Sequence, residues 1–401
     1  MKLDFLKREA PKVPQTPPAA PQRKAATGAV LAMAAAGAGG VGIARDGAAL
    51  VRHGFAGNPV GFRSVKMIAE AAAALPLVVQ DAACRYDAHP VGCLVARPNP
   101  AQGRAELLEA LVGQILLTGN GYLEAVGGAP GALPLELHVL RGDRMAVVPG
   151  ADGWPVAYDY RVGSKVRRFD MTAEVPPLCH IRNFHPSDDH YGLAPLQAAA
   201  GAVEVHNAAS RWSKALLDNA ARPSGAITYQ SAEGQGMMPG DLYDRLVDEI
   251  TTNYMGARNA GRPMLLEGGL DWKPMGFSPS DMEFQKTKEA AAREIALAFG
   301  VPPMLLGIPG DATYANYQEA NRAFYRLTVL PMAARVVAQL SAFLGRFTGD
   351  AVEVQIDLDK VPALSAEREA QWRRVAAADF LSADEKRAML GLPPRNAGEA
   401  T

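Results

Sequence analysis

The sequence predicts an α+β protein in which a mixed module of helices and strands carries a long two-helix projection. Short alternating or β-branched runs between positions 120 and 184 are separated by Gly, Pro and Asp turns, as in an antiparallel meander. Apolar residues at helical spacing precede these runs. Two helices with sharp start and stop signals, over 195–221 and 281–300, then enclose a compact α/β insert.

Length and composition are those of an ordinary globular protein. The chain has 401 residues, 48% of them apolar, which is enough to bury a substantial core in roughly two or three modules. The formal net charge of −1 creates no global field that would attract nucleic acid or a membrane surface. Cys84, Cys93 and Cys179 are scattered and lack a C-x-x-C spacing, which argues against a disulfide framework and fits a reducing compartment.

Residues 1–45 are expected to form a flexible tail. They are rich in Pro, Ala and Gly and carry several basic residues, a composition that cannot bury enough apolar surface to fold alone. The apolar run 29–44 consists of Ala and Gly rather than Leu or Val, so we expect neither a signal peptide nor a membrane span there. No other run is expected to be long enough to cross a bilayer, and no membrane is an expected partner.

The mixed module is expected to occupy residues 46–193. Helical spacing runs over 64–74 and 103–117, and these helices end at Pro76 and at the turn 118–121, which contains an Asn-Gly reversal signal. The strand-like runs are 122–126, 135–140, 144–149, 155–162, 165–170 and 178–184. Helices followed by a strand meander predict a mixed α+β module.

The projection begins where Pro195 suits the first turn of a helix that Arg222-Pro223 stops. The second helix opens at the capping box Ser280-x-x-Glu283 and closes at Gly300. The insert between them contains strand-like "SGAITYQ", a helix over about 241–255 and strand-like "RPMLLEGGLDWKPM". We therefore expect a stalk with a small α/β tip.

The last third of the chain begins with a loop of small polar residues over about 308–316. The helical pattern that follows, to about 344, contains Pro331, which lacks a backbone donor and predicts a kink. The run "AVEVQIDLD" is expected to return as a strand. Two final helices follow, the second opening at the capping box Ser382-x-x-Glu385 and ending at "GLPP".

One string and one cluster in the sequence resemble sites of chemistry. Gly37-x-Gly39-x-x-Gly42 matches the dinucleotide fingerprint, but an Ala-rich tail precedes it where a strand is needed, so we interpret it as a coincidence. The cluster consists of Cys179, His180, His185, Asp188, Asp189 and His190. Metal sites need ligands that converge from rigid elements, whereas these residues straddle a strand end and a Pro-containing loop.

Two interpretations of this cluster stay open. One is a metal-dependent hydrolase that uses His180, His185, Asp188 and His190, and the other, which we favour, is a polar turn that feeds the next helix. On a regular strand Cys179 and His180 point to opposite faces, which favours the turn. Because no nucleophile elbow, P-loop or kinase motif is present, we expect no enzyme, no catalytic residue, no metal and no cofactor.

The order of these segments resembles that of portal proteins of the HK97 family, the rings through which double-stranded DNA enters and leaves the capsids of tailed phages. The matching pieces are "LLTGNGYLEAV", "HIRNF" with "YGLAPL", "ARPSGAI", "MEFQKTKEAAAREIALAFGVPPMLLGI", "NYQEANRAFYRLTVLP" and "LSADEKRAMLGLPP". They span about residues 50 to 394 in the family's order. The compact, Ala-rich form is also similar to portals of bacterial gene transfer agents.

The resemblance implies a ring, usually of twelve subunits, built from wing, stem, clip and crown regions. The implied regions are a tail at 1–45, the wing at 46–193, stem helices at 194–221 and 280–300, the clip at 222–279, the tunnel loop with the long kinked helix and a returning wing strand at 301–360, and a short crown at 361–401. A tail or adaptor ring subunit is the alternative among structural proteins.

The resemblance also implies partners and a location. The partners would be double-stranded DNA in the channel, the large terminase that drives packaging, a head-tail adaptor and the major capsid protein. The ring would lie at the unique vertex of a virion or gene-transfer-agent particle, after assembly in the bacterial cytoplasm. It would have no catalytic activity of its own.

Residues that line the channel are expected to touch DNA weakly, because tight phosphate contacts would stop it from sliding. In the tunnel loop these residues are Asp311, Thr313, Tyr314, Asn316 and Gln318. In the second stem helix they are Lys286, Lys288 and Arg293, which nearby Glu residues balance. The stem residues would equally fit ion pairs on a solvated or subunit-facing helix surface.

A closed ring needs two different contact surfaces on each subunit. Trp212, Leu216, Phe299 and Phe324 are candidates for packing between neighbours, with the core of the same chain as the alternative. In the clip, Arg258, Asn259 and Arg262 are expected to form a basic turn that docks the motor or the adaptor. A plain solvated loop is the alternative for these three.

Overall fold

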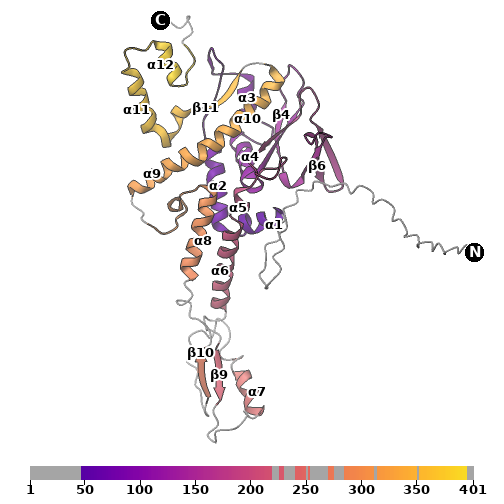
Figure 1. Cartoon of the computed structure of the whole chain (residues 1–401), viewed down its shortest axis with the longest axis vertical. Helices are drawn as coiled ribbons and strands as arrows, with labels where there is room; N and C mark the ends of the chain where they lie inside the picture. Colours follow the sequence, from indigo (N-terminus) through magenta and orange to yellow (C-terminus); the bar gives the residue numbers. More distant parts are fainter. Residues whose placement is uncertain are drawn as a thin grey trace, which may run out of the picture.

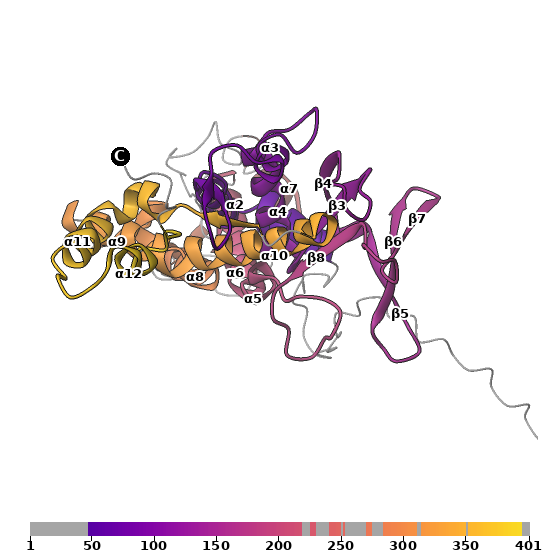
Figure 2. The same cartoon turned by 90° about the horizontal axis from the view of Figure 1, so that it is seen from above.

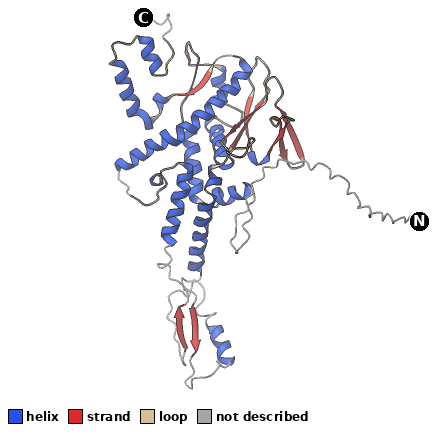
Figure 3. Cartoon of the chain, viewed as in Figure 1, coloured by secondary structure: helices blue, strands red, loops and turns tan. Residues whose placement is uncertain are grey.

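The computed structural model describes residues 47–218, 225–229, 240–249, 252, 270–274, 284–310, 314–349 and 352–394. Its helices and antiparallel sheets confirm the predicted α+β class. Figure 1 shows a broad body from which α6 (Ala200–Asp218) and α8 (Phe284–Phe299) run downward as a pair. Beyond them lies a small tip. In Figure 3 the strands lie only in the body and in this tip.

The centre of the body consists of helices. They are α1 (Gly47–Val51), the π-helical η1 (Arg52–Ala56), α2 (Pro59–Ala73), α3 (Pro90–Ala96) and α4 (Arg104–Thr118). The start of α2 lies five residues before its predicted start at Ser64, because the Asn58 side chain accepts hydrogen bonds from the N–H groups of Val60 and Gly61. The end of α4 at the predicted turn is confirmed, with Gly119 at φ +78°.

The six predicted strand runs are confirmed as strands of two three-stranded sheets. One sheet has the order β4-β3-β8 and contains β3 (Asn120–Val126), β4 (Glu136–Leu140) and β8 (Leu178–Arg182). The other is the sequential meander β5 (Met145–Pro149), β6 (Pro155–Val162) and β7 (Lys165–Asp170), which follows the 3-10 turn η2 (Gly142–Arg144). The meander therefore covers only half of the predicted run, since β3 pairs with the distant β8.

A third sheet joins strands from an early and a late part of the chain. It has the order β11-β1-β2, in which β11 (Glu353–Ile356) is the predicted returning strand. The other two members, β1 (Leu77–Gln80) and β2 (Arg85–Tyr86), were not predicted, because runs of four and two residues give almost no periodicity. The β1–β11 pairing makes residues before 90 and after 350 parts of one body.

The two-helix projection is confirmed over the described residues. The short α5 (Pro195–Ala198) begins at Pro195 as predicted and leads into α6, and α8 ends at Gly300, which has φ +67°. The predicted capping box at Ser280 lies outside the described residues. In the tip, β9 (Gly225–Tyr229) pairs antiparallel with β10 (Leu270–Pro274), and α7 (Gly240–Glu249) is the helix at this end of the molecule (Figure 1).

The predicted kink near Pro331 takes the form of a π-helical segment. After the 3-10 turn η5 (Pro303–Leu306), the long helix comprises α9 (Tyr314–Phe324), the π-helical η6 (Tyr325–Val329) and α10 (Leu330–Thr348). Within it the N–H of Leu330 bonds to the carbonyl of Tyr325, five residues back. This wider turn accommodates a proline that has no N–H to continue the α-helical ladder.

The expectation that no run is long enough to cross a bilayer is wrong for this helix. By length and composition alone, the stretch Asn316–Thr348 is long and apolar enough to cross a bilayer. However, 44% of its most apolar 18-residue segment is buried inside the protein. Val336, Leu340 and Phe343, each at most 2% exposed, are among the residues that it contributes to the main hydrophobic core. Its apolar character is thus explained by packing in the body.

The C-terminal helices extend from the body at the end opposite the meander, as the view from above shows (Figure 2). The turns η7 (Leu358–Lys360) and η8 (Pro362–Leu364) lead into α11 (Ser365–Ala376) and α12 (Ala383–Met389). The predicted capping box is confirmed, since the N–H of Glu385 donates to the Ser382 hydroxyl at 3.3 Å and the N–H of Ser382 to the Glu385 carboxylate at 2.8 Å.

Candidate functional site

The start of the polar loop at about 308–316 is hydrogen-bonded to α8 of the same chain. The guanidinium of Arg293 donates a hydrogen bond to the carbonyl of Pro309. It also lies close to Gly310, where an added Cβ would be 3.5 Å from it. Arg293 was predicted to line a channel, whereas the structure gives it a partner at the beginning of the loop.

Three of the five predicted loop residues lie in the first turns of α9, because this helix begins at Tyr314 and not after residue 316. Asn316 and Gln318 are exposed in the first turns of this helix, and Tyr314 is its first residue. Asp311 and Thr313 lie outside the described residues. Exposed polar side chains at this point are compatible with the expected weak contacts, and Tyr317, which is 51% exposed, extends the same surface.

The two predicted stem lysines differ in their surroundings. Lys286 is exposed, whereas Lys288 is partly buried. Burial, and then the charge of Lys288, lower the pKa of His206 on α6, so Lys288 lies close to the other stem helix. Gln285 and Glu289 form a hydrogen-bonded i,i+4 pair at 2.7 Å. Lys288 is thus partly covered by its own chain, and its place in a channel stays a prediction.

Two of the four predicted interface residues belong to the core of the chain. Phe299 is 4% exposed and Phe324 is 3% exposed, and both are part of the main hydrophobic cluster. For these two residues the burial favours the alternative, the core of the same chain, because their rings are covered within a single subunit. Trp212 is partly buried, and the side chain of Leu216 lies outside the described residues. The clip residues Arg258, Asn259 and Arg262 also lie outside them.

His180 is enclosed in a small polar and aromatic cluster. Its ring stacks on Tyr122 with 4.3 Å between ring centroids. Its Nε2 lies 3.0 Å from the side-chain oxygen of Asn120, so Nε2 carries the proton, and its Nδ1 accepts from the Tyr158 hydroxyl at 3.0 Å. Burial lowers the pKa of His180 to about 3. His180 is thus neutral and has both ring nitrogens occupied.

The rest of the His and Asp cluster forms a turn. Cys179 is buried in the main core, on the opposite side of the sheet from His180, as strand alternation predicts. The N–H of Ser187 donates to Nδ1 of His185, and the carboxylate of Asp188 accepts from the N–H groups of His190 and Tyr191. Among the residues that the structure describes, no group of three or more His, Cys, Asp or Glu is placed to hold a metal. The arrangement is that of a polar turn.

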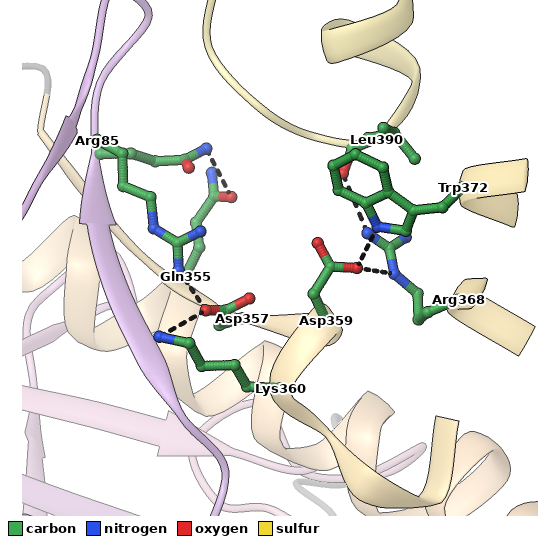
Figure 4. Close-up of polar contacts among 9 residues, drawn as sticks. Arg85, Gln355, Asp357, Asp359, Lys360, Arg368, Trp372 and Leu390 are labelled. Atoms are coloured by element: carbon green, nitrogen blue, oxygen red, sulfur yellow. Dashed lines mark hydrogen bonds and ion pairs between the residues drawn. The ribbon is translucent and has the colours of Figure 1, made fainter. Parts of the chain in front are cut away.

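Two aspartates after β11 connect the C-terminal helices to the body (Figure 4). Asp357, which is 7% exposed, forms ion pairs with Arg85 of β2 and with Lys360, the latter at 3.5 Å. Asp359 accepts hydrogen bonds from Arg368 at 2.6 Å and from the Trp372 indole at 3.0 Å. The first contact fixes η7 to the sheet, and the second fixes α11 to η7.

Sequence reasoning did not identify this junction. The Asp359 contacts lower the pKa of its carboxyl group, chiefly through the Arg368 hydrogen bond. Arg368 also donates to the carbonyl of Leu390 at 3.3 Å, which brings the end of α12 into the same network. The sequence signal was the pair of acidic residues in "QIDLDK". Lys360 lies in the same run, but Arg85 lies far away along the chain and Arg368 lies in the next helix.

Comparison with known proteins gives consistent matches over most of the chain. The family model for phage portal proteins matches residues 59–391. An uncharacterized protein of Rickettsia bellii (strain RML369-C) is 36% identical over 347 residues, which is 86% of this chain and 89% of that protein. An HK97-family phage portal protein from Corynebacterium diphtheriae shares the fold, with a TM-score of 0.54 at 16% identity over 79% of this chain and 97% of that chain.

Two solved assemblies contain a chain that is much more similar. A chain from the neck of an empty gene transfer agent (GTA) particle, computed with C6 symmetry, is 69% identical, with a TM-score of 0.69 over 88% of this chain and 94% of that chain. A chain from the neck of a native GTA particle, computed with C12 symmetry, is 68% identical, with a TM-score of 0.68 over 88% of this chain and 95% of that chain.

Proposed function

The chain belongs to the phage portal protein family, and from this premise we propose that its copies form the DNA channel at one vertex of a gene-transfer-agent particle. The observation that carries the proposal is the 68% identity, over 88% of this chain, to a chain in the neck of a native GTA particle computed with C12 symmetry. A ring of twelve copies in the same place is the assembly that this similarity favours.

The shape of the chain supports a ring with a central passage. The paired helices α6 and α8 correspond to the stem, the unit of β9, β10 and α7 to the clip, and the C-terminal helices to the crown. On α8 the positions Lys286, Arg293 and Leu297 are exposed. An exposed helix face beside the start of the loop is a surface that can line a channel.

The channel is proposed to hold DNA without gripping it. Each phosphate that a fixed cation neutralises adds salt-dependent binding and would oppose sliding. Arg293 is engaged by the Pro309 carbonyl, and Lys288 is partly buried next to α6. Of the three predicted stem cations, Arg293 is thus bonded within its own subunit and Lys288 is only partly accessible, which keeps the attraction for DNA small.

The partners follow from the same proposal. The clip at 222–279 would dock the large terminase during packaging and the head-tail adaptor afterwards, while the wing would contact the major capsid protein. The ring would do no chemistry, since ATP hydrolysis would belong to the terminase. Assembly in the bacterial cytoplasm would precede packaging, and the finished ring would remain in the particle neck.

Two measurements test the proposal. Light scattering and negative-stain images of the purified full chain should show closed rings, and a monodisperse monomer at high concentration would contradict the portal assignment. Deletion of residues 310–315 should leave ring assembly intact but reduce the DNA content of particles, because the loop would no longer narrow the channel. The control is Asp152→Ala, in the exposed turn between β5 and β6, which should change neither quantity. Unchanged DNA content after the deletion would overturn the role of the loop.

A further inference from the structure

An open apolar groove of about 790 Å³ runs between α10 and β11. One wall is a row of small or apolar residues at four-residue spacing, Leu330, Ala334, Ala338 and Ala342, which share one face of the helix. The other wall contains Val352 and, on β11, Ile356. The groove contains neither the predicted channel residues nor the crown junction, by which we mean the contacts of Asp357 and Asp359 that join the C-terminal helices to the body.

The floor of the groove is closed by contacts within the chain. The N–H of Val354 donates to the hydroxyl of Ser341 at 2.9 Å, and both residues are buried. The walls are different, because Ala334, Ala338 and Ala342 are exposed to solvent. Since their side chains are small, the backbone of another element can approach α10 closely here.

The borders of the groove resemble those of a protein–protein contact. Arg326 and Glu353 place one charge of each sign among its lining residues. Leu327, which is 69% exposed, lies next to Arg326, and Leu358, which is 38% exposed, is itself a lining residue. An apolar centre with a polar rim is typical of an interface between proteins. DNA would instead need several cations, and Arg326 is the only Lys or Arg among the described residues that line the groove.

We propose that this groove receives the next copy of the chain in the ring. The inference rests on the proposed function, because a closed ring joins two different surfaces of the same subunit and places a copy on each side. The similarity to a chain in a C12 neck makes a second copy the expected neighbour. Burial of the exposed row of alanines would give that contact its apolar centre.

Chemical labelling tests which molecule covers the groove. Ala338→Cys and Gln339→Cys place a thiol on adjacent exposed residues of α10, but only position 338 lines the groove. In purified rings the thiol at 338 should react at least about tenfold more slowly with a soluble maleimide than the thiol at 339. In protomers separated by size exclusion the two rates should be similar. Mass spectrometry of the labelled peptides separates these sites from the exposed native Cys93.

A pair of substitutions tests whether the contact is needed for assembly. Ala338→Arg should reduce the fraction of chain in rings severalfold, because a charged side chain would fill an apolar contact. Gln339→Arg adds the same charge one residue away and should leave the ring fraction unchanged. Both positions are exposed in the single chain, so circular dichroism and the melting temperature of the protomer should be unaffected. Equal ring fractions for the two variants would overturn the proposal.

The outcomes also separate this inference from the portal assignment. Rings with a rapidly reacting thiol at 338 would overturn the groove contact and leave the portal function standing. Slow reaction already in the protomer would mean that the chain covers its own groove. Slow reaction only in whole particles would mean that another particle protein is the occupant. Either of these two results would overturn the proposal that a second copy of the chain fills the groove. Failure of the unmodified chain to form any ring would instead contradict the proposed function.

Discussion

The hydroxyl of Thr328 donates a hydrogen bond of 2.6 Å to the carbonyl of Gly300, which joins the π-helical part of the long helix to the end of α8. Gly300 has φ +67°, a conformation that side chains with a Cβ rarely adopt. A Cβ at this position would also lie 2.8 Å from the Thr328 hydroxyl. The junction between the stem and the long helix therefore needs glycine for two independent reasons.

We predict that Gly300→Ala lowers the free energy of unfolding by about 2–3 kcal/mol, because backbone strain and the steric conflict with Thr328 add. The measurement is urea unfolding at fixed protein concentration. Gly307→Ala is the matched control, since Gly307 has φ +72° but nothing within 4 Å of an added Cβ. The unfolding free energy of this control should fall by only about 1 kcal/mol, because the backbone strain is its sole cost. Equal losses for the two variants would show that the Thr328 contact does not matter.

His180 should make the protein less stable as the pH falls from 7.5 to 5. Its folded pKa is about 3 against an ordinary value of 6.5, so the unfolded chain binds a proton in this range and the folded chain does not. Stability is therefore lost as pH falls below about 6.5, by about 2 kcal/mol at pH 5. The difference in unfolding free energy between the two pH values should shrink in His180→Asn. An unchanged difference in that variant would mean that other groups cause the loss.

The crown junction should weaken when Asp359 loses its charge. Asp359→Asn removes the ion pair with Arg368, which is 13% exposed, and weakens the bond from the Trp372 indole. We expect a loss of about 1–3 kcal/mol and increased solvent access of Trp372, measured by acrylamide quenching of its fluorescence. Trp372→Phe identifies the contribution of this indole among the four tryptophans of the chain. Unchanged quenching in Asp359→Asn would count against the junction.

A fall in pH should also weaken the crown junction, as the Asp359→Asn substitution does. The folded pKa of Asp359 is lowered, so its contribution is complete above the ordinary aspartate pKa and is lost as pH falls through the lowered folded value. Quenching of Trp372 should thus increase only below about pH 4. The Asp359→Asn variant should show high quenching at neutral pH and little further change in acid.

Loss of Arg293 should free the start of the loop. In Arg293→Ala the Pro309 carbonyl loses its donor, and amide hydrogen exchange over 307–310 should increase severalfold while rings still form. Arg293→Lys keeps the charge but removes the planar guanidinium, so exchange should also increase. If exchange in the lysine variant matched that of the natural chain, any cationic donor to Pro309 would be sufficient and the guanidinium shape would not matter.

Local signals in the sequence were sufficient for most of the secondary structure. The bounds of β6 and β7, the start of α5 at Pro195 and the Ser382–Glu385 capping box were all predicted. Each depends on interactions between residues a few positions apart, which periodicity and capping motifs record. The family was also recognisable from short motifs in a fixed order.

The surroundings of individual side chains were decided by tertiary structure alone. Phe299 and Phe324 are apolar residues on helices, and nothing local distinguishes a core position from a subunit contact. The pairing of β1 with β11, the enclosure of His180 by Asn120 and Tyr158, and the Arg293–Pro309 contact each join segments that are distant in the chain or separated by a turn. By itself the sequence determined the elements and their order, because these follow from neighbouring residues. Only the folded chain determined which face of each element stays exposed, because burial depends on all the segments that pack together.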